Sequence, residues 1–306
     1  MRTVTPPIGQ RIDIGGRGTW VHRAGEGHPA VVFVPGAGSF GLDFALVQER
    51  VSKFATAILY DRAGTGWSDD AELPRTATQV TDELRAVLHA IAGRAPYVLV
   101  GHSLGGAYVQ RYAQRFPDEV AGLILLDPAH EDWNLFMPED LQIRAEDMHE
   151  VELPPEYIAM VRKQFTPVFA PFPETIRDQV IERHLGADRL MAGVREGLNF
   201  LDVLDDLRAG GSRPDVPLII LNGTAIDPSQ AQFRSEAQLR QQISDSRRLY
   251  ESVVAAAPQG EYRAVPEASH SNIPMVSPAA VADAVRDVLE RRRLPDVRGE
   301  LKLRSV

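Results

Sequence analysis

One serine in this sequence stands where a serine could act as a nucleophile. The segment VLVGHSLGGAY (98–108) contains the pattern G-x-S-x-G, with Ser103 at its centre. An apolar, strand-like run precedes the pattern and a helix-like stretch follows it. In this context the pattern forms a strained turn that exposes the serine hydroxyl. We therefore expect Ser103 to be a nucleophile whose Oγ atom points into a cleft.

Two backbone N–H groups could stabilise the negative charge that develops when a serine attacks a carbonyl group. The first belongs to Leu104, at the start of the helix that follows the serine. The second would come from the loop PGAGS (35–39), which follows another strand-like run. Its glycines permit a close approach of the backbone, and Ala37 supplies the donor. We expect Ala37 and Leu104 to form an oxyanion hole.

A serine needs a neighbouring base, and His270 is the predicted one among eight histidines. His270 follows the strand-like stretch EYRAVP and precedes the last helical segment, so its loop can return to the carboxyl edge of a sheet. His102 adjoins the serine in the chain, but consecutive side chains point in different directions. His102 is therefore not expected to take the proton.

A carboxylate must orient the imidazole and stabilise its protonated form. Asp227, in NGTAIDPSQ, is the first choice because the chain order Ser103, Asp227, His270 is the order of this motif class. Asp127 ends the strand-like run AGLILLD and is the rival. Glu267 is a third alternative.

The elements that must position these residues can be read from short apolar runs. Five runs, each ending in Gly or Asp, are typical of strands buried on both faces of a parallel sheet: AVVFVPG (30–36), ATAILYD (55–61), PYVLVG (96–101), AGLILLD (121–127) and PLIILNG (217–223). Two shorter strands, RIDI and GTWVHRAG, are expected before them, joined by a glycine turn. The sequence thus predicts an α/β fold with a mostly parallel sheet.

Helical patterns alternate with the first strands and then replace them. Apolar residues recur at helical spacing in residues 78–93, residues 104–116 are expected to form a helix that ends before Pro117, and residues 277–293 a terminal helix. Residues 130–213 contain helical stretches and no convincing strand. We expect a core of residues 1–129 and 214–306, with residues 130–213 as an inserted helical lid over the site.

Composition excludes several other classes of protein. The 306 residues carry a formal charge of -9, which disfavours a nucleic-acid partner. The absence of cysteine removes thiolate nucleophiles and sulfur-ligated metals. The first residues lack the apolar stretch of a secretory signal, and no segment is apolar enough for a membrane span, so a cytoplasmic location is expected.

With these residues placed, the chain resembles the α/β-hydrolase superfamily from about residue 11 to 291. The loop YDRAGTGWSD (60–69) is similar to the loop after that superfamily's fourth strand. YVLVGHSLGG resembles its nucleophile elbow, and PEASHSNIP its histidine loop. The resemblance implies the α/β-hydrolase fold, the triad Ser103, His270 and Asp227, and an oxyanion hole of Ala37 and Leu104.

Two positions depart from the superfamily's pattern. Members often have a histidine before the first oxyanion glycine, where this chain has Pro35, so a supporting side-chain hydrogen bond is in doubt. The acid usually lies three residues after a glycine at the strand end, whereas Asp227 lies four after Gly223, which keeps Asp127 as an alternative. The elbow serine disfavours dehalogenase and epoxide hydrolase chemistry, because those relatives use an elbow aspartate.

The expected function is cleavage of a small-molecule carboxylic ester or lactone through an acyl-enzyme, with no cofactor and no metal. The patterns H-E-x-x-H and H-x-x-E-H of zinc hydrolases are absent from the sequence. The same triad could also serve acyl transfer, perhydrolysis, or hydrolysis of an amide or carbon–carbon bond. A receptor-like protein with a vestigial triad is the alternative from another class. Substrate identity and oligomeric state are not predicted.

Overall fold

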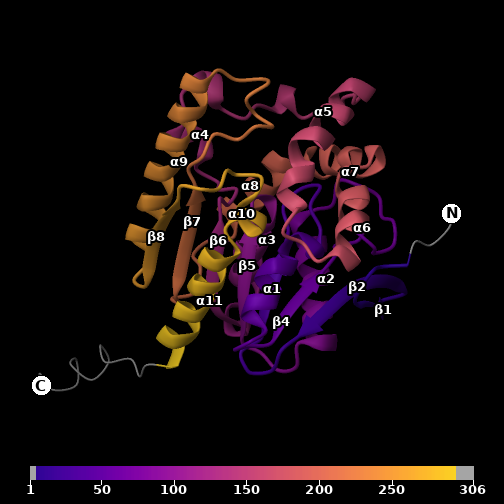
Figure 1. Ribbon diagram of the computed structural model, residues 1–306. Coiled ribbons are helices and arrows are strands. Elements are labelled where there is room, and N and C mark those ends of the chain that lie inside the picture. Colours follow the sequence, from indigo (N-terminus) through magenta and orange to yellow (C-terminus); the bar gives the residue numbers. More distant parts are fainter. Residues whose placement is uncertain (1–4, 294–306) are drawn as a thin grey trace, which may run out of the picture.

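The computed structural model describes residues 5–293, and within them the chain forms a sheet of eight strands in the order β1-β2-β4-β3-β5-β6-β7-β8 (Figure 1). β2 is antiparallel to both of its neighbours, and all other pairs are parallel. The strands are β1 (Gln10–Ile14), β2 (Arg17–Ala24), β3 (Val31–Val34), β4 (Ala57–Tyr60), β5 (Tyr97–His102), β6 (Val120–Leu126), β7 (Leu218–Gly223) and β8 (Gly260–Val265).

The five apolar runs of the sequence form the centre of this sheet. They correspond to β3, β4, β5, β6 and β7, and every residue of these strands is buried. Strands that are covered by helices on both faces lack a polar face, which is why the runs do not alternate. The predicted fold class, an α/β-hydrolase fold with a mostly parallel sheet and a helical insertion between two late strands, is confirmed.

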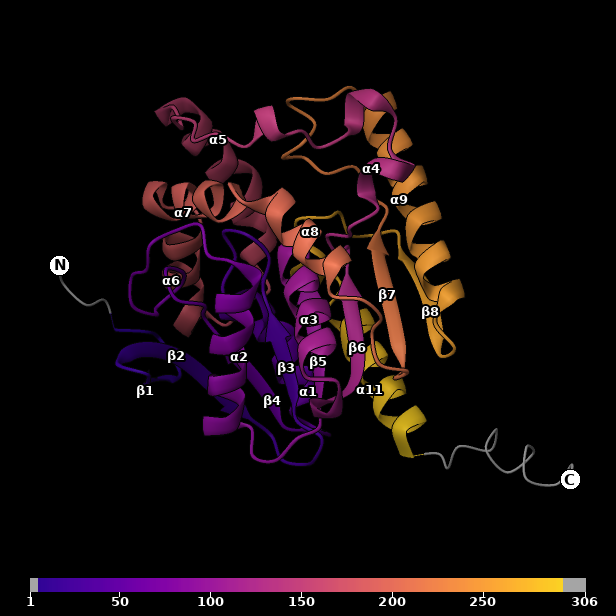
Figure 2. The same cartoon turned by 180° about the vertical axis from the view of Figure 1, so that it is seen from behind.

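Helices cover both faces of the sheet (Figures 1 and 2). Apolar residues of α1 and α11 form one core cluster with one face of the strands, whereas α2, α3 and α9 contribute to a second cluster. The bounds are α1 (Ala45–Val51), α2 (Ala77–Ile91), α3 (Leu104–Arg115), α9 (Glu236–Ala256), α10 (Ile273–Val276) and α11 (Pro278–Arg293). No helix within residues 5–293 is both long and apolar enough to cross a membrane.

The segment between β6 and β7, here called the lid (residues 130–213), is helical and contains no strand in the structure. Its α-helices are α4 (Trp133–Phe136), α5 (Pro155–Phe165), α6 (Glu174–His184), α7 (Ala187–Gly197) and α8 (Phe200–Ala209). In Figure 1 the helices α5 and α7 lie beyond the carboxyl ends of the parallel strands. In open α/β sheets this edge is where ligands bind. The exact limits of lid and core remain a prediction.

Candidate active site

Ser103 occupies the turn between β5 and α3 in a conformation that few residues other than glycine adopt. Its φ is 50°, and within residues 5–293 the only other non-glycine residue with a positive φ is Asp127, at 39°. The turn is held on both sides, because Ser103 N–H donates to Leu126 O at 3.0 Å and Ser103 O accepts from Gly106 N at 2.9 Å. Such strain persists where the surroundings over-determine it, which is common at functional sites.

The two motif glycines are required because the elbow is crowded. A Cβ atom on Gly101 would lie 2.6 Å from the carbonyl oxygen of Gly105, and a Cβ on Gly105 would overlap the carbonyl oxygen of Val34. Real Cβ atoms do not approach other atoms so closely. The glycines therefore allow β3, β5 and α3 to meet closely around the serine.

Ser103 and His270 lie together, as the sequence analysis predicted for them. His270 Nε2 is 3.1 Å from Ser103 Oγ, although the two residues are 167 positions apart. Ser103 also makes no capping bond to the N-terminus of α3, so its hydroxyl is available to the histidine. A serine and an imidazole at this distance can exchange a proton directly.

His102 holds the loop that carries His270. Its Nε2 lies 2.7 Å from the backbone oxygen of His270, and its ring is buried. Burial lowers the pKa of His102 to about 3, so the ring is neutral near neutral pH. The Nε2–H therefore donates to the His270 carbonyl. Sequence reasoning rejected His102 as the base but did not identify this contact.

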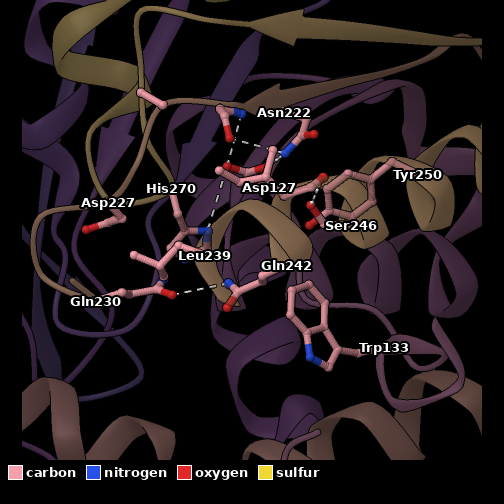
Figure 3. A pocket seen from close by; sticks show the side chains of 13 residues that line it. Asp127, Trp133, Asn222, Asp227, Gln230, Leu239, Gln242, Ser246, Tyr250 and His270 are labelled. Carbon is pink, nitrogen blue, oxygen red and sulfur yellow. Dashed lines mark hydrogen bonds and ion pairs between the residues drawn. The ribbon is translucent and has the colours of Figure 1, made fainter. Parts of the chain in front are cut away.

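Asp127 is the carboxylate closest to the ring of His270. Its Oδ2 lies 3.8 Å from His270 Nδ1, an ion-pair distance that is longer than a hydrogen bond (Figure 3). Asn222 Nδ2 donates to Asp127 Oδ1 at 2.5 Å, and Gly223 N–H donates to Oδ2 at 3.1 Å. Burial raises the pKa of Asp127 to about 6, while His270, Asn222 and Gly223 oppose this rise.

Asp227, the first choice of the sequence analysis, makes its direct contacts with the backbone and with a hydroxyl. Its Oδ2 accepts from Ser271 N at 2.9 Å, and its Oδ1 accepts from Ser229 N–H and Ser229 Oγ at 2.9 and 2.6 Å. Burial opposes ionisation, but Ser229, the nearby His270 and Ser271 together lower the pKa of Asp227. Within residues 5–293, Asp127 and not Asp227 has a carboxylate oxygen within 4.0 Å of a ring nitrogen of His270.

The third alternative for the acid, Glu267, is engaged elsewhere. Its Oε1 accepts a hydrogen bond from Ser277 Oγ at 2.9 Å, at the start of α11. In Figure 3, Asp127 and Asp227 are drawn on opposite sides of His270. The structure thus brings two carboxylates to the histidine, of which Asp127 faces Nδ1.

The two predicted oxyanion donors lie on segments that adjoin Ser103. Leu104 begins α3 directly after the serine, and Ala37 lines a cavity together with Ser103 and His270. Within the described residues, neither the Leu104 N–H nor the Ala37 N–H donates a backbone hydrogen bond. An unengaged N–H is what an oxyanion donor requires, and the role of these two groups as an oxyanion hole remains a prediction.

Ser103 lies between two cavities. One, of about 390 Å³, is bordered mostly by apolar side chains, among them Trp133, Leu141, Ile143, Phe200, Phe233 and Tyr250. The other, of about 290 Å³, lies between the loop 36–39 and lid helices, and it includes Tyr157, Phe165, His184 and Arg189. An ester carries an acyl substituent and an alcohol substituent on its carbonyl carbon. The two cavities that meet at Ser103 can accommodate one substituent each.

Two apolar segments of the lid, residues 165–172 and 198–207, divide between these cavities and the core. Phe200 and Phe165 each border a cavity that contains Ser103, whereas Phe169 and Phe172 are buried in a core cluster. Trp67, in the loop after β4, is buried and packs edge-on against Phe40 with ring centroids 5.2 Å apart. Periodicity alone could not separate these two roles.

Comparison with known proteins gives relatives for part of the chain. A segment of 120 residues, 39% of this chain, is 32% identical to 2-(acetamidomethylene)succinate hydrolase of Mesorhizobium japonicum, of which it covers 42%. The chain matches less than half the length of this hydrolase and of two uncharacterised proteins of Bacillus subtilis. These similarities therefore concern a portion of each protein.

Solved structures resemble nearly the whole chain at low sequence identity. A thermophilic esterase from Thermogutta terrifontis has a TM-score of 0.62 at 20% identity, with 94% of this chain and 98% of the esterase covered. An enol-lactonase from Burkholderia xenovorans LB400 has a TM-score of 0.60 at 20% identity, with 92% and 99% covered. Likeness at this identity shows the fold alone.

The family follows from a match over most of the sequence. Residues 31–284 match the model of the alpha/beta hydrolase family, a range that includes the elbow, both carboxylates and the histidine loop. The chain belongs to the alpha/beta hydrolase family.

Proposed function

We propose that this protein is a serine hydrolase that cleaves a carboxylic ester or lactone through an acyl-enzyme on Ser103. Membership of the alpha/beta hydrolase family and the similarity to a curated hydrolase support hydrolysis in general. Solved structures that resemble this chain include an esterase and an enol-lactonase, so the fold accommodates both reactions. The observation that carries the proposal is the 3.1 Å separation of His270 Nε2 and Ser103 Oγ between two cavities.

In the first half-reaction, Ser103 Oγ attacks the carbonyl carbon of the substrate and His270 Nε2 takes the hydroxyl proton. The carbonyl oxygen becomes an oxyanion, which the N–H groups of Ala37 and Leu104 stabilise. The bond between the carbonyl carbon and the alcohol oxygen then breaks, and His270 returns its proton to the leaving alkoxide. Ser103 is left as an ester of the acyl group.

In the second half-reaction, water replaces the alcohol. His270 takes a proton from the water as its oxygen attacks the acyl carbon, and a second oxyanion forms in the same place. The bond to Ser103 Oγ breaks, His270 returns the proton to the serine, and the carboxylic acid leaves. Both half-reactions use the same groups, so no cofactor enters the proposal.

We propose Asp127, which faces His270 Nδ1, as the acid of the triad. Its oxygen is at ion-pair distance, and its backbone shares with Ser103 the rare positive φ of a position fixed by its surroundings. Catalytic hydrogen bonds are often long in a ligand-free enzyme and shorten when substrate binds. Asp227 is proposed to hold the histidine loop through Ser271 N–H.

The test is turnover of a panel of p-nitrophenyl esters and lactones by the purified protein and by Ser103→Ala. A fluorophosphonate that labels serine nucleophiles should add its mass to Ser103 in the wild type and not in the variant. Turnover that survives in Ser103→Ala would remove the proposal. Binding of esters with neither turnover nor labelling would instead indicate a receptor-like protein. Turnover of amides or diketones alone would assign the same triad to another acyl reaction.

A further inference from the structure

A buried ion pair joins the lid to the loop beside the nucleophile. Arg62 follows β4 and Glu196 lies on α7, and their side chains are only 1% and 5% exposed. Arg62 Nε donates to Glu196 Oε1 at 2.9 Å, and Arg62 Nη2 donates to Oε2 at 3.0 Å. Removal of two charges from water is costly unless their hydrogen bonds are satisfied. Both charged groups are therefore expected to have further hydrogen-bond partners.

Those remaining partners are backbone atoms of the loop that carries the predicted oxyanion donor. Arg62 Nη1 donates to Pro35 O at 2.5 Å, and Nη2 donates to Gly36 O at 2.7 Å. Glu196 Oε2 accepts from Gly38 N–H at 2.8 Å. The ion pair thus holds this loop by hydrogen bonds on both sides of Ala37.

The direction of the Ala37 N–H follows from these contacts. In a trans peptide unit the C=O and N–H bonds point in opposite directions. Gly36 O and the Ala37 N–H belong to one peptide unit, so the bond from Arg62 to Gly36 O directs the Ala37 N–H away from Arg62. The bond from Gly38 N–H to Glu196 fixes the next unit in the same way. A flip of either unit would remove one hydrogen bond from a buried charged group, which is disfavoured.

The lid helix reaches this loop through a backbone contact. A Cβ atom on Gly193 of α7 would lie 2.8 Å from Gly38 Cα, whereas a Cβ on Gly197, one turn further along the same helix, would meet nothing within 4 Å. The approach of α7 to Gly38 therefore depends on a missing side chain at position 193. Figure 2 shows α7 above the strands from the opposite side.

We propose that Glu196 is a positioning residue that couples docking of the lid to formation of the oxyanion hole. With α7 docked, Glu196 holds Arg62 and Gly38, and the Ala37 N–H is oriented for the oxyanion. When α7 moves away, Gly38 N–H loses its acceptor, and Arg62 loses the counter-charge that holds its guanidinium against Gly36 O, so both peptide units are held less firmly. This inference rests on the proposed function, because the hole matters only for an acyl reaction.

The first test is Glu196→Gln, which keeps the shape of the side chain and removes its charge. We expect kcat for a p-nitrophenyl ester to fall roughly 10²-fold, as expected for loss of one oxyanion donor, with KM changed only a few-fold. An alkyl boronic acid forms a tetrahedral adduct with a nucleophilic serine and directs an oxygen to the oxyanion site. Its Ki should rise by the factor by which kcat/KM falls, an effect that general destabilisation does not produce.

The matched control is Glu150→Gln. Glu150 is another carboxylate of the lid that pairs with an arginine, Arg195, at 2.7 Å, but both side chains are half-exposed. We expect this variant to keep the kcat and the boronate Ki of the wild type. A loss of kcat as large as that in Glu196→Gln would mean that any lid carboxylate has this effect, and would overturn the inference.

A second pair of variants tests the inference without a change of charge. Gly193→Ala adds a methyl group against Gly38 and should lower kcat and weaken boronate binding, whereas Gly197→Ala should resemble the wild type. Thermal melts identify any variant that does not fold. If Glu196→Gln does not fold, the kinetics of Gly193→Ala test the inference in its place. No ester turnover by the wild type would contradict the proposed function itself. If the wild type is active, folded variants at positions 196 and 193 with kcat and Ki within about twofold of it would overturn this inference alone.

Discussion

His270 Nδ1 faces the carboxylate of Asp127 at 3.8 Å, while the carboxylate of Asp227 is engaged by Ser229 and Ser271. Chain order alone favours Asp227, but the orientation of the imidazole favours Asp127. Both residues follow β-strands whose carboxyl ends are adjacent in the sheet, β6 and β7. Either residue can therefore serve as the acid that orients His270 with little change in the fold. Substitutions must decide which of them does.

Asp127→Asn should lower kcat for an ester roughly 10⁴-fold, because an amide in this place favours the wrong imidazole tautomer. Asp227→Asn is the matched control and should cost much less, since an amide oxygen can still accept from Ser271 N–H. Steady-state kinetics on one ester, with thermal melts to verify folding, gives the comparison. The opposite ranking would return the role to Asp227, as the sequence analysis predicted.

The acidic limb of the pH profile should report Asp127. Its pKa is raised to about 6 by burial, so kcat/KM should fall as the pH is lowered through about 6, where the carboxylate gains a proton and His270 loses its counter-charge. Asn222→Leu removes the amide N–H that favours the ionised form. The pKa of Asp127 then rises, and the limb should move to higher pH. A limb at the same pH in both proteins would assign it to another group.

Much of the fold, and the position of Ser103 in a strained turn, could be predicted because their signals are local. Buried strands appear as apolar runs, and the elbow is defined by five consecutive residues. The long helix α9 escaped the sequence analysis, although Ser235 and Gln238 form a capping box at its start. Its apolar residues are sparse along 21 positions, so the stripe was not recognised.

The parts that could not be predicted are contacts between distant segments. Arg62 and Glu196 are 134 positions apart, and no local pattern pairs them. Pro35 stands where relatives often have a histidine, which placed a supporting side-chain hydrogen bond to the loop 35–39 in doubt. The structure supplies the support from Arg62, by bonds to the backbone oxygens of Pro35 and Gly36. The choice between Asp127 and Asp227 likewise depends on the orientation of one ring.

The apolar cavity beside Ser103 should determine which esters are accepted. Ile143→Trp places a large side chain in the cavity of about 390 Å³. We expect kcat/KM for a bulky ester to fall roughly tenfold or more, because the indole takes the space in which a large substituent would make apolar contacts. An acetate makes few such contacts, so its kcat/KM should change little. Val151→Trp, at an exposed position of the lid, is the control. Equal losses on bulky and small esters would show that the cavity does not receive the substrate.

His130, which begins the lid, should make the protein less stable in acid. Burial is the main cause that lowers the pKa of His130 to about 4, and the ring is 3% exposed. An unfolded chain has a histidine pKa near 6.5, so as the pH falls from about 6.5 to about 4 the unfolded state binds a proton that the folded state does not. The free energy of unfolding should therefore decrease over this interval, by an amount on the order of 3 kcal/mol for this residue.

The variant His130→Asn isolates this effect, because an amide oxygen can still accept the hydrogen bond that Asp132 N donates to His130 Nδ1 at 3.1 Å. Urea unfolding at a series of pH values would compare it with the wild type and with His149→Asn, which removes an exposed histidine of the lid. The stability of His130→Asn should decline less steeply below pH 6.5 than that of the other two proteins, since the unfolded variant has no imidazole here to protonate. Three parallel curves would show that position 130 carries no such penalty. The acid sensitivity would then arise elsewhere in the fold.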